Sequence, residues 1–319
     1  MTAARTAQDS STPAAARVSL RRGRRRPGER VIEALLVVAA AVSVATTVGI
    51  VVALVEPTVE FFAEVGVVEF LTGDRWTPTL DPRSYGVLPL LTSTIISTFI
   101  AVAIAIPLGL GSAIYLAEYA SGRTRKALKP LLEVLAGIPT VVYGFFALFA
   151  LNSVLRSIWP GTDQPDFQNI LVASIVMGIM IVPTVASLSE DAMTAVPESL
   201  RAGAYALASS KMQVAVRVVL PAAVSGIVAS FVLGLSRAIG ETMIVTIAGG
   251  LSSDHIELNP LRAAATMTAF IANIGQGDVP VDSLDYRSIF AVGSLLFGFT
   301  FALNALSIRL VRRFREVYE

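Results

Sequence analysis

The stretch VPESLRAGAYALASSKMQVAVRVVLP, residues 196–221, is the most informative connection in this chain of 319 residues. It is more polar than the long apolar segments on either side of it, and it is rich in good helix formers. Pro197 and Glu198 are residue types favoured in a first helical turn, so a short helix is expected to begin there. The two serines at 209–210 suit a turn, and the second helix then reaches Pro221, which permits a kink. The stretch therefore predicts two short helices joined by a turn.

Six long apolar segments make the chain an integral membrane protein. Hydrophobic residues account for 54% of the chain, charged residues for only 15%, and the mean hydropathy is +0.68, which is too apolar for a soluble surface. A helix that spans a bilayer needs about 20 apolar residues at a rise of ~1.5 Å each. The segments that qualify are 31–55, 88–117, 128–151, 168–188, 221–249 and 288–311. The sequence predicts an all-α fold with six transmembrane helices.

The basic residues predict the orientation of these helices. Of the 25 Lys and Arg residues, nineteen fall in the N-terminal thirty residues, in 118–129, in 189–220 and in the tail from Arg309. The connections on the other side hold five, against thirteen acidic residues, and Arg237 is the one left inside a predicted span. Because cytoplasmic connections are enriched in Lys and Arg, both termini and segment 189–220 are predicted to be cytoplasmic.

The first thirty residues are predicted to form a disordered basic arm that precedes a membrane domain over 31–319. They are rich in Ala, Ser, Thr and Arg and show no apolar periodicity. A transit peptide or a twin-arginine signal is the alternative. The apolar run that follows is too long for the core of a signal peptide, so an uncleaved first helix is favoured.

Residues 59–76 are too charged to span a membrane, yet their apolar residues have helical spacing. This pattern predicts a helix along the outer interface, with Trp76 at the level of the lipid headgroups.

The stretch 196–221 resembles the coupling loop of ATP-binding-cassette importer permeases. That loop has the pattern E-A-A, three residues, G, nine residues, I, one residue, L-P. In this chain the matching positions are Ala202, Gly203, Ala204, Ala208, Val218, Leu220 and Pro221. Two positions depart from the pattern, because Ala202 replaces the expected Glu and Ala208 replaces the expected loop Gly. An alanine-rich amphipathic connector without a coupling role is the alternative.

Four further stretches narrow the resemblance from importer permeases in general to one type of permease subunit. LTGDRWTP (71–78), YGVLPLLTST (85–94), AGIPTVVYGFFAL (136–148) and GLSRAIGETM (234–243) resemble PstC-type permease subunits of bacterial phosphate importers. The resemblance implies a type I importer fold in the bacterial inner membrane. It also implies four kinds of partner: a homologous second permease, two ATP-binding subunits, an extracytoplasmic phosphate-binding protein and membrane lipid. The segment 189–220 would seat on an ATP-binding subunit, and no nucleic acid is involved.

The residue composition excludes several kinds of catalytic and metal-binding site from the chain itself. It lacks the phosphate-cradling pattern G-x-x-x-x-G-K-[ST], has no cysteine, and contains one histidine, His255. No ATPase, thiol or paired-histidine metal site is therefore expected. The chain is predicted not to be an enzyme and to bind no cofactor, while a partner subunit would bind ATP and magnesium.

Arg237 and Glu241 are predicted to lie in the fifth span, where a charge costs at least ~2.5–3.5 kcal/mol. At 100° per residue both fall on the side of a ridge of small residues, which favours close helix packing and turns both charges toward protein or a cavity. The ridge consists of Gly226, Ser230, Gly234 and Ala238. One interpretation is an ion pair that holds the bundle. The other is a guanidinium that binds phosphate or a gate partner, oriented by Glu241.

Other candidates for the pathway or gate are weaker. Pro139 would mark a break in the third span that lines the pathway, or only a packing kink. Ser93 and Thr94 would offer hydroxyls to an oxyanion, or would bond their own backbone. Glu190 and Asp191 are interpreted as a feature of a helix start or loop rather than an acid and base pair.

The sequence predicts the membrane permease of an ATP-driven phosphate importer and leaves three alternatives. The first is a permease for another oxyanion, such as sulfate or molybdate. The second is a membrane scaffold or sensor component that transports nothing. The third is a proton- or ion-coupled carrier, which is disfavoured because Glu241 is the one acid deep in a predicted span.

Overall fold

The computed structural model describes residues 27–160, 164–277 and 279–313, nearly all of whose regular structure is helical. The chain divides into two compact units, residues 1–51 and 52–319, and each is described by itself. The helices are α1 (Pro27–Glu64), α2 (Val67–Thr72), α3 (Leu88–Ile114), α4 (Gly122–Ala136), α5 (Thr140–Phe145), α6 (Asn152–Ile158), α7 (Ile170–Thr194), α8 (Glu198–Ala206), α9 (Lys211–Val214), α10 (Leu220–Ile239), α11 (Met267–Gln276) and α12 (Leu284–Arg313). Four π-helical turns, η1 (Tyr115–Tyr119), η2 (Phe146–Leu151), η3 (Ala215–Val219) and η4 (Val245–Gly249), extend or follow α3, α5, α9 and α10.

The predicted fold of six apolar spans is confirmed. Six helices in the described residues are long and apolar enough to cross a membrane: Gly28–Glu64, Leu88–Tyr119, Thr140–Ile158, Ile170–Thr194, Lys211–Ile239 and Leu284–Arg309. The predicted basic arm lies outside the described residues except for 27–30, which form the first turn of α1.

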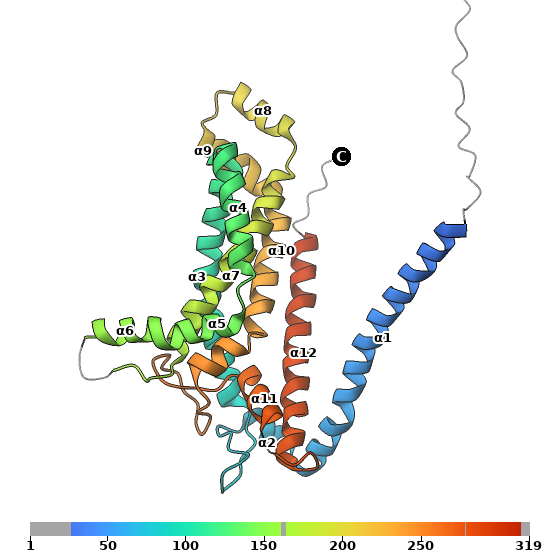
Figure 1. Ribbon diagram of the computed structural model, residues 1–319, viewed down its shortest axis with the longest axis vertical. Coiled ribbons are helices and arrows are strands. Elements are labelled where there is room, and N and C mark those ends of the chain that lie inside the picture. Colours follow the sequence, from blue (N-terminus) through green and yellow to red (C-terminus); the bar gives the residue numbers. More distant parts are fainter. Residues whose placement is uncertain (1–26, 161–163, 278, 314–319) are drawn as a thin grey trace, which may run out of the picture. The chain divides into compact units, whose positions relative to one another are not determined.

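The third span differs from the prediction of one helix over 128–151. The chain breaks at 137–139, and the apolar helix with the length of a span begins at Thr140. Before the break, α4 runs along α3 and α7, whereas α6 runs across the direction of α3, α7, α10 and α12 (Figure 1). The reason is that Gly137 ends α4 and Pro139, which lacks an N–H, begins α5 in an extended conformation.

The fifth span also differs from the predicted range, 221–249. The long helix begins earlier, at Lys211, and α10 ends at Ile239, where Gly240 forms the C-cap. Residues 245–249 form the separate turn η4. Glu241 therefore follows the helix and does not lie within it.

The central helices α3, α7 and α10 pack closely because small residues lie at their crossings. A methyl group added at Gly178 of α7 would lie 2.8 Å from the carbonyl oxygen of Ala101 in α3. The predicted ridge of small residues on α10 does face α7, since a methyl group at Gly234 would lie 3.1 Å from Val185. On the same ridge, the hydroxyls of Ser230 and Ser189 are 2.7 Å apart. Small side chains let helix backbones approach closely, as they do here.

The α2–α11 end of the second unit has its own aromatic core. Phe61, Phe70, Trp76 and Phe270 are buried there, and the Trp76 and Phe270 ring centroids lie 4.9 Å apart. The loop over 73–86 folds Trp76 inward, so that 1% of it is exposed, while its place at the level of the lipid headgroups stays a prediction. Its backbone N–H donates to the Ser253 carbonyl at 3.0 Å.

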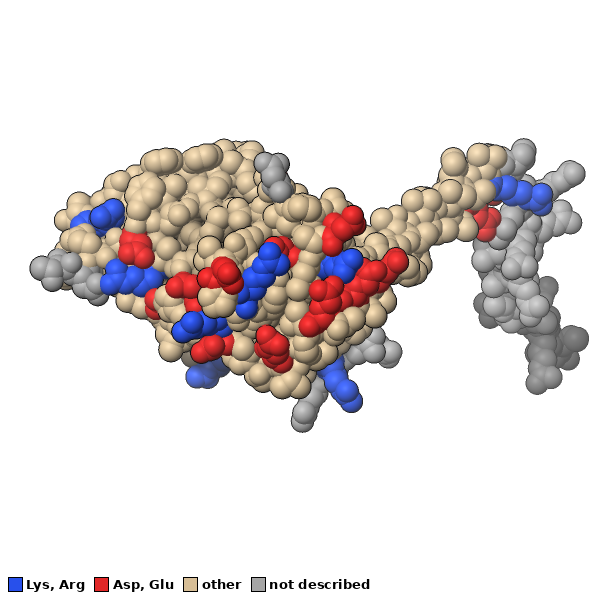
Figure 2. Space-filling model, turned by 90° about the horizontal axis from the view of Figure 1, so that it is seen from below, with Lys and Arg blue, Asp and Glu red and all other residues tan. Residues whose placement is uncertain are grey.

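Beside this core, Tyr85 is buried and its hydroxyl donates to Asp285 at 2.7 Å. Burial and this hydrogen bond raise the pKa of Tyr85. Figure 2, seen from below, shows acidic and basic side chains gathered on this end. Among them, Arg287 pairs with Glu60 and Glu64, each at 3.2 Å.

Gly86 is expected to tolerate no side chain, because two backbone segments touch at this point. A methyl group at Gly86 would lie 2.3 Å from the carbonyl carbon of Gly73. Gly86→Ala should therefore lower the free energy of unfolding by about 2–3 kcal/mol, the usual cost of overpacking. Thermal unfolding in detergent measures this change. Gly275→Ala is the matched control, since nothing lies within 4 Å of the added methyl group and the helix should be slightly stabilised. Equal midpoints for the two variants would contradict the expectation.

Candidate functional site

Arg237 lies in the last turn of α10, half-buried, with its guanidinium directed toward α7. Its Nη1 donates to the Thr184 hydroxyl at 3.0 Å. A guanidinium carries five N–H donors, and in the described part of the chain this is the one hydrogen bond it makes. The C-terminal end of a helix favours a cation, which helps to hold the charge there. Arg237 therefore presents spare donors inside the bundle.

Glu241 does not pair with Arg237 in the described residues, so the predicted ion pair is absent from this structure. Its carboxylate instead accepts hydrogen bonds from the backbone N–H groups of Met243, at 3.1 Å, and Ile244, at 3.3 Å. Its own carbonyl accepts from the Thr268 hydroxyl at 2.7 Å. The Glu241 carboxylate thus caps the turn after α10, because the first turn of a helix has free N–H groups. The Glu241 carbonyl links the same turn to Thr268 of α11.

Tyr143 bridges the break at Pro139. The Tyr143 hydroxyl donates to the Leu135 carbonyl at 2.9 Å, which joins α5 to α4 across the break. Pro139 itself is exposed and caps α5. The hydrogen bonds of Arg237 in the described residues do not reach this break, so the structure does not join the two sequence candidates directly.

Ser93 and Thr94 are buried and their hydroxyls are used within the chain. Ser93 donates to the Pro89 carbonyl at 2.9 Å and Thr94 to the Leu90 carbonyl at 2.7 Å. Thr94 also accepts from the N–H of Met267 at 3.0 Å. Neither is hydrogen-bonded to Arg237 in the described residues. In this structure both hydroxyls follow the backbone-bonding alternative, and Thr94 positions the start of α11.

The α8–α9 end forms the predicted pair of short helices. Pro197 precedes α8 and Ser210 caps α9 in a capping box with Gln213. Between them Ala208 adopts φ 59°, the left-handed conformation that favours glycine. The glycine that the coupling-loop pattern expects at this position would adopt this conformation without strain. Ala202 and Gly203 are exposed on α8 and Ala204 is half-buried, while Leu220 and Pro221 begin α10.

Apolar side chains are left uncovered at the turn between α8 and α9. Leu207 is 84% exposed and Met212 68% exposed, and Tyr205 lies beside them on the surface. Exposed apolar side chains of this kind make a surface that suits a protein partner.

Arg201 attaches α8 to the rest of the bundle. Its guanidinium donates to the Glu118 carboxylate of η1 at 3.1 Å and to the Met193 carbonyl at 2.8 Å and the Val196 carbonyl at 2.6 Å, near the end of α7. Only 13% of the Arg201 side chain and 5% of the Glu118 side chain are exposed. A fork of this kind satisfies carbonyls that a helix end leaves free. The sequence alone assigned neither residue a role, since their separation in the chain hides the pair.

Arg201→Met is expected to destabilise the α8–α9 end. It leaves Glu118 buried with no cation and frees two carbonyls, at a cost of about 2–3 kcal/mol once partial exposure is considered. Faster proteolysis of segment 189–220 in the variant would measure this loss. Arg217→Met is the matched control because Arg217 is exposed on the neighbouring η3. The same proteolysis rate in both variants would contradict the anchoring role.

Glu190 and Asp191 belong to an ion cluster between α7 and α4, which corrects their interpretation as a helix start or loop. Glu190 is 1% exposed and pairs with Arg125 and, at 2.8 Å, with Lys129. Lys129 also binds Asp191 at 2.7 Å. Hydrogen bonds to Asp191 and Glu190 raise the pKa of Lys129, so it stays charged. Two bases four residues apart on an amphipathic helix, and an adjacent pair of acids, were the available sequence signal.

The described residues form no group of three or more His, Cys, Asp or Glu side chains arranged to hold a metal ion. The side chains described at this site offer hydrogen-bond donors, from Arg237, and apolar surface, at the turn between α8 and α9. The chemistry that these features support is the recognition of an anion by Arg237 and the contact with a partner at the α8–α9 end.

Comparison with known proteins relates the chain to membrane transport. Residues 105–316 match the family profile described as binding-protein-dependent transport system inner membrane component. The chain is 35% identical over 253 residues to the probable ABC transporter permease protein YqgH of Bacillus subtilis, covering 79% of this chain and 80% of that protein. It is 33% identical over 260 residues to the phosphate transport system permease protein PstC of Mesorhizobium japonicum, covering 76% and 78%. Its fold resembles a chain of a bacterial alginate ABC transporter crystallised with a periplasmic protein, with a TM-score of 0.57 and 16% identity, covering 91% and 98%.

Proposed function

This chain belongs to the family of binding-protein-dependent transport system inner membrane components, and from this premise we propose that it is the permease subunit of an ATP-driven phosphate importer. Two relatives that are 33% and 34% identical are phosphate transport system permease proteins PstC. The membership makes it a multi-pass membrane protein of the type I importer fold. The substrate is the part of the proposal that experiment has to test.

Arg237 is the observation that supports an anionic substrate. A half-buried guanidinium with one hydrogen bond inside the bundle has donors left for an oxyanion, and its planar fork matches two phosphate oxygens. The alternative of a sealed structural ion pair gains no support, because Glu241 is occupied by backbone N–H groups.

The proposal includes partners that supply what this chain lacks. A second, homologous permease would complete the pathway, two ATP-binding subunits would bind ATP and magnesium, and an extracytoplasmic protein would deliver phosphate. The exposed Leu207 and Met212 support contact of the α8–α9 end with an ATP-binding subunit. This end would face the cytoplasm together with both termini, in agreement with the basic residues of α4, α8 and α9.

Uptake of labelled phosphate at micromolar concentration tests the function directly. Cells with and without the chain are compared, with excess sulfate and molybdate as competitors and with ATP depletion as a second arm. Uptake that requires the chain, stops on ATP depletion and ignores both competitors is the expected result. Full competition by sulfate or molybdate would reassign the substrate, and unchanged uptake without the chain would favour a scaffold or sensor role.

A further inference from the structure

Helix α4 is attached to the bundle in an unusual way, because none of its residues is buried. Its strong contacts with α7 are polar: Arg125 and Lys129 reach Glu190 and Asp191, and Arg125 also donates to the Thr194 hydroxyl at 2.9 Å. An apolar interface would hold a helix over its whole length. A cluster of ion pairs holds it at one point.

The chain is extended at both ends of α4, which permits the helix to move as a unit. Ser121 caps its start in an extended conformation, with ψ 155°. At its other end Gly137 is followed by Ile138 and by Pro139, which has ψ 136°. Helix breaks of this kind absorb rotations in hinge motions.

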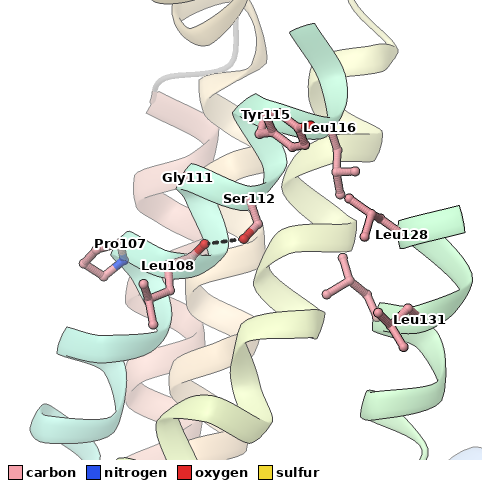
Figure 3. A pocket seen from close by; sticks show the side chains of 9 residues that line it. Pro107, Leu108, Gly111, Ser112, Tyr115, Leu116, Leu128 and Leu131 are labelled. Atoms are coloured by element: carbon pink, nitrogen blue, oxygen red, sulfur yellow. Dashed lines mark hydrogen bonds between the residues drawn. The ribbon is translucent and has the colours of Figure 1, made fainter. Parts of the chain in front are cut away.

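An open groove lies beneath α4. It has a volume of about 480 Å³ and is lined by Pro107, Leu108, Gly111, Ser112, Tyr115, Leu116, Leu128, Leu131 and Leu132. In Figure 3, Leu116 of η1 and Leu128 and Leu131 of α4 point toward one another across it. The one hydrogen bond drawn there, from the Ser112 hydroxyl to the Leu108 carbonyl, stays within α3. The two sides of the groove thus share apolar surface without interlocking, so little packing opposes their separation.

We propose that α4 is a hinged flap whose position is set by Glu190, and that release of this ion cluster lifts α4 from the groove during each transport cycle. The proposal rests on the proposed function, because it assigns Glu190 a positioning role in transport. Glu190 acts through α4, and it does not touch the substrate.

Lifting α4 would act on α5 through Tyr143. This residue lies beyond the break and is hydrogen-bonded back to Leu135 in α4. Glu190 lies on α7 four residues before the end of that helix, close to the Met193 carbonyl that Arg201 of α8 binds. A movement of the α8–α9 end is therefore connected through α7 and α4 to α5.

A single cysteine in the groove tests the flap, since the chain has no cysteine of its own. Leu116→Cys places a thiol that is covered in this structure, and Gly111→Cys places one on the open side of the same groove. The rate of maleimide labelling is measured in membranes that contain the whole transporter, with and without ATP. In the Leu116→Cys protein, ATP should raise the rate, because α4 opens during turnover.

Adding Glu190→Gln to Leu116→Cys should raise the labelling rate about tenfold and make it independent of ATP. Glu190 is buried, and its loss removes the carboxylate that both Arg125 and Lys129 of α4 contact, which costs more than the loss of an exposed surface pair. Lys129→Gln is the second variant and should give a smaller increase in the same direction. Glu133→Gln is the matched control, because Glu133 is an exposed acid on α4 with no side-chain partner in the described residues. The rate at Gly111→Cys should stay constant throughout.

Equal labelling of Leu116→Cys with and without Glu190→Gln would overturn the proposal, and so would the same increase from Glu133→Gln. Phosphate uptake is measured on the same membranes. Loss of uptake specificity in the parent protein, with the labelling difference preserved, would reject the proposed substrate and keep the flap. Normal phosphate uptake with no labelling difference would reject the flap and keep the proposed substrate.

Discussion

Arg237→Ala is expected to abolish phosphate uptake while the protein remains in the membrane with its partners. Within the described residues the side chain makes one hydrogen bond, to Thr184, so its loss should leave the bundle folded. Its remaining donors are the groups proposed to bind the oxyanion. Losing two charge-assisted hydrogen bonds, at about 1.5–3 kcal/mol each, lowers the uptake rate by roughly 100-fold or more. Uptake of labelled phosphate and co-purification of the partner subunits measure the two parts of this expectation.

Two further variants separate the fork from the charge. Arg237→Lys keeps the charge but loses the planar pair of donors, so uptake should fall to an intermediate value. Arg156→Ala is the matched control because Arg156 is exposed on α6 and should be replaceable without effect. Full uptake in Arg237→Ala would remove this residue from the mechanism. Loss of co-purification would show instead a structural role.

Leu207→Asp combined with Met212→Asp is expected to detach the ATP-binding subunits and thereby stop uptake. Both side chains are mostly exposed, so the substitutions disturb little inside the chain. In a partner interface each apolar side chain would contribute about 1.5–3 kcal/mol, and a buried carboxylate would oppose binding further. The expected result is that the affinity for the ATP-binding subunit falls by about 100-fold or more.

Co-purification of the ATP-binding subunit measures this effect. Leu258→Asp is the control, because Leu258 is 70% exposed in the loop that precedes α11, at the opposite end of the second unit. It should leave co-purification unchanged. If the double variant retains the ATP-binding subunit and its uptake, the α8–α9 end is not the coupling surface, and the scaffold or connector alternative gains support.

The sequence predicted several features of the site correctly, and each rests on local physics. The turn between α8 and α9 follows from residues that act on their own neighbours, such as Pro197 and Ser210. The small-residue ridge of α10 was readable from a helical period of 3.6, and it packs closely against another helix as expected, which the structure identifies as α7. The same periodicity failed for Glu241, because the helix ends before this residue and a rotation of 100° per residue no longer applies to it.

The contacts that the sequence did not reveal join residues that are far apart in the chain. Arg201 and Glu118 are 83 positions apart, and Lys129 and Glu190 are 61 apart, so no local pattern relates them. Trp76 packs against Phe270, which lies far along the chain, so the sequence did not show that this ring is buried. An aromatic core of this kind gains from the large apolar area of each ring.

The sequence by itself determined that the chain is an all-α membrane protein with six apolar spans, because hydropathy and helix length are properties of continuous segments. It also determined the two short helices within residues 196–221 and the family resemblance. Only the tertiary structure decided which partner each charged side chain has. Arg237 binds the Thr184 hydroxyl, Glu241 binds the turn that follows it, and Glu190 binds cations of α4. The physical reason is that a buried charge must find a partner wherever the packing of the helices brings one, and that packing depends on the whole fold.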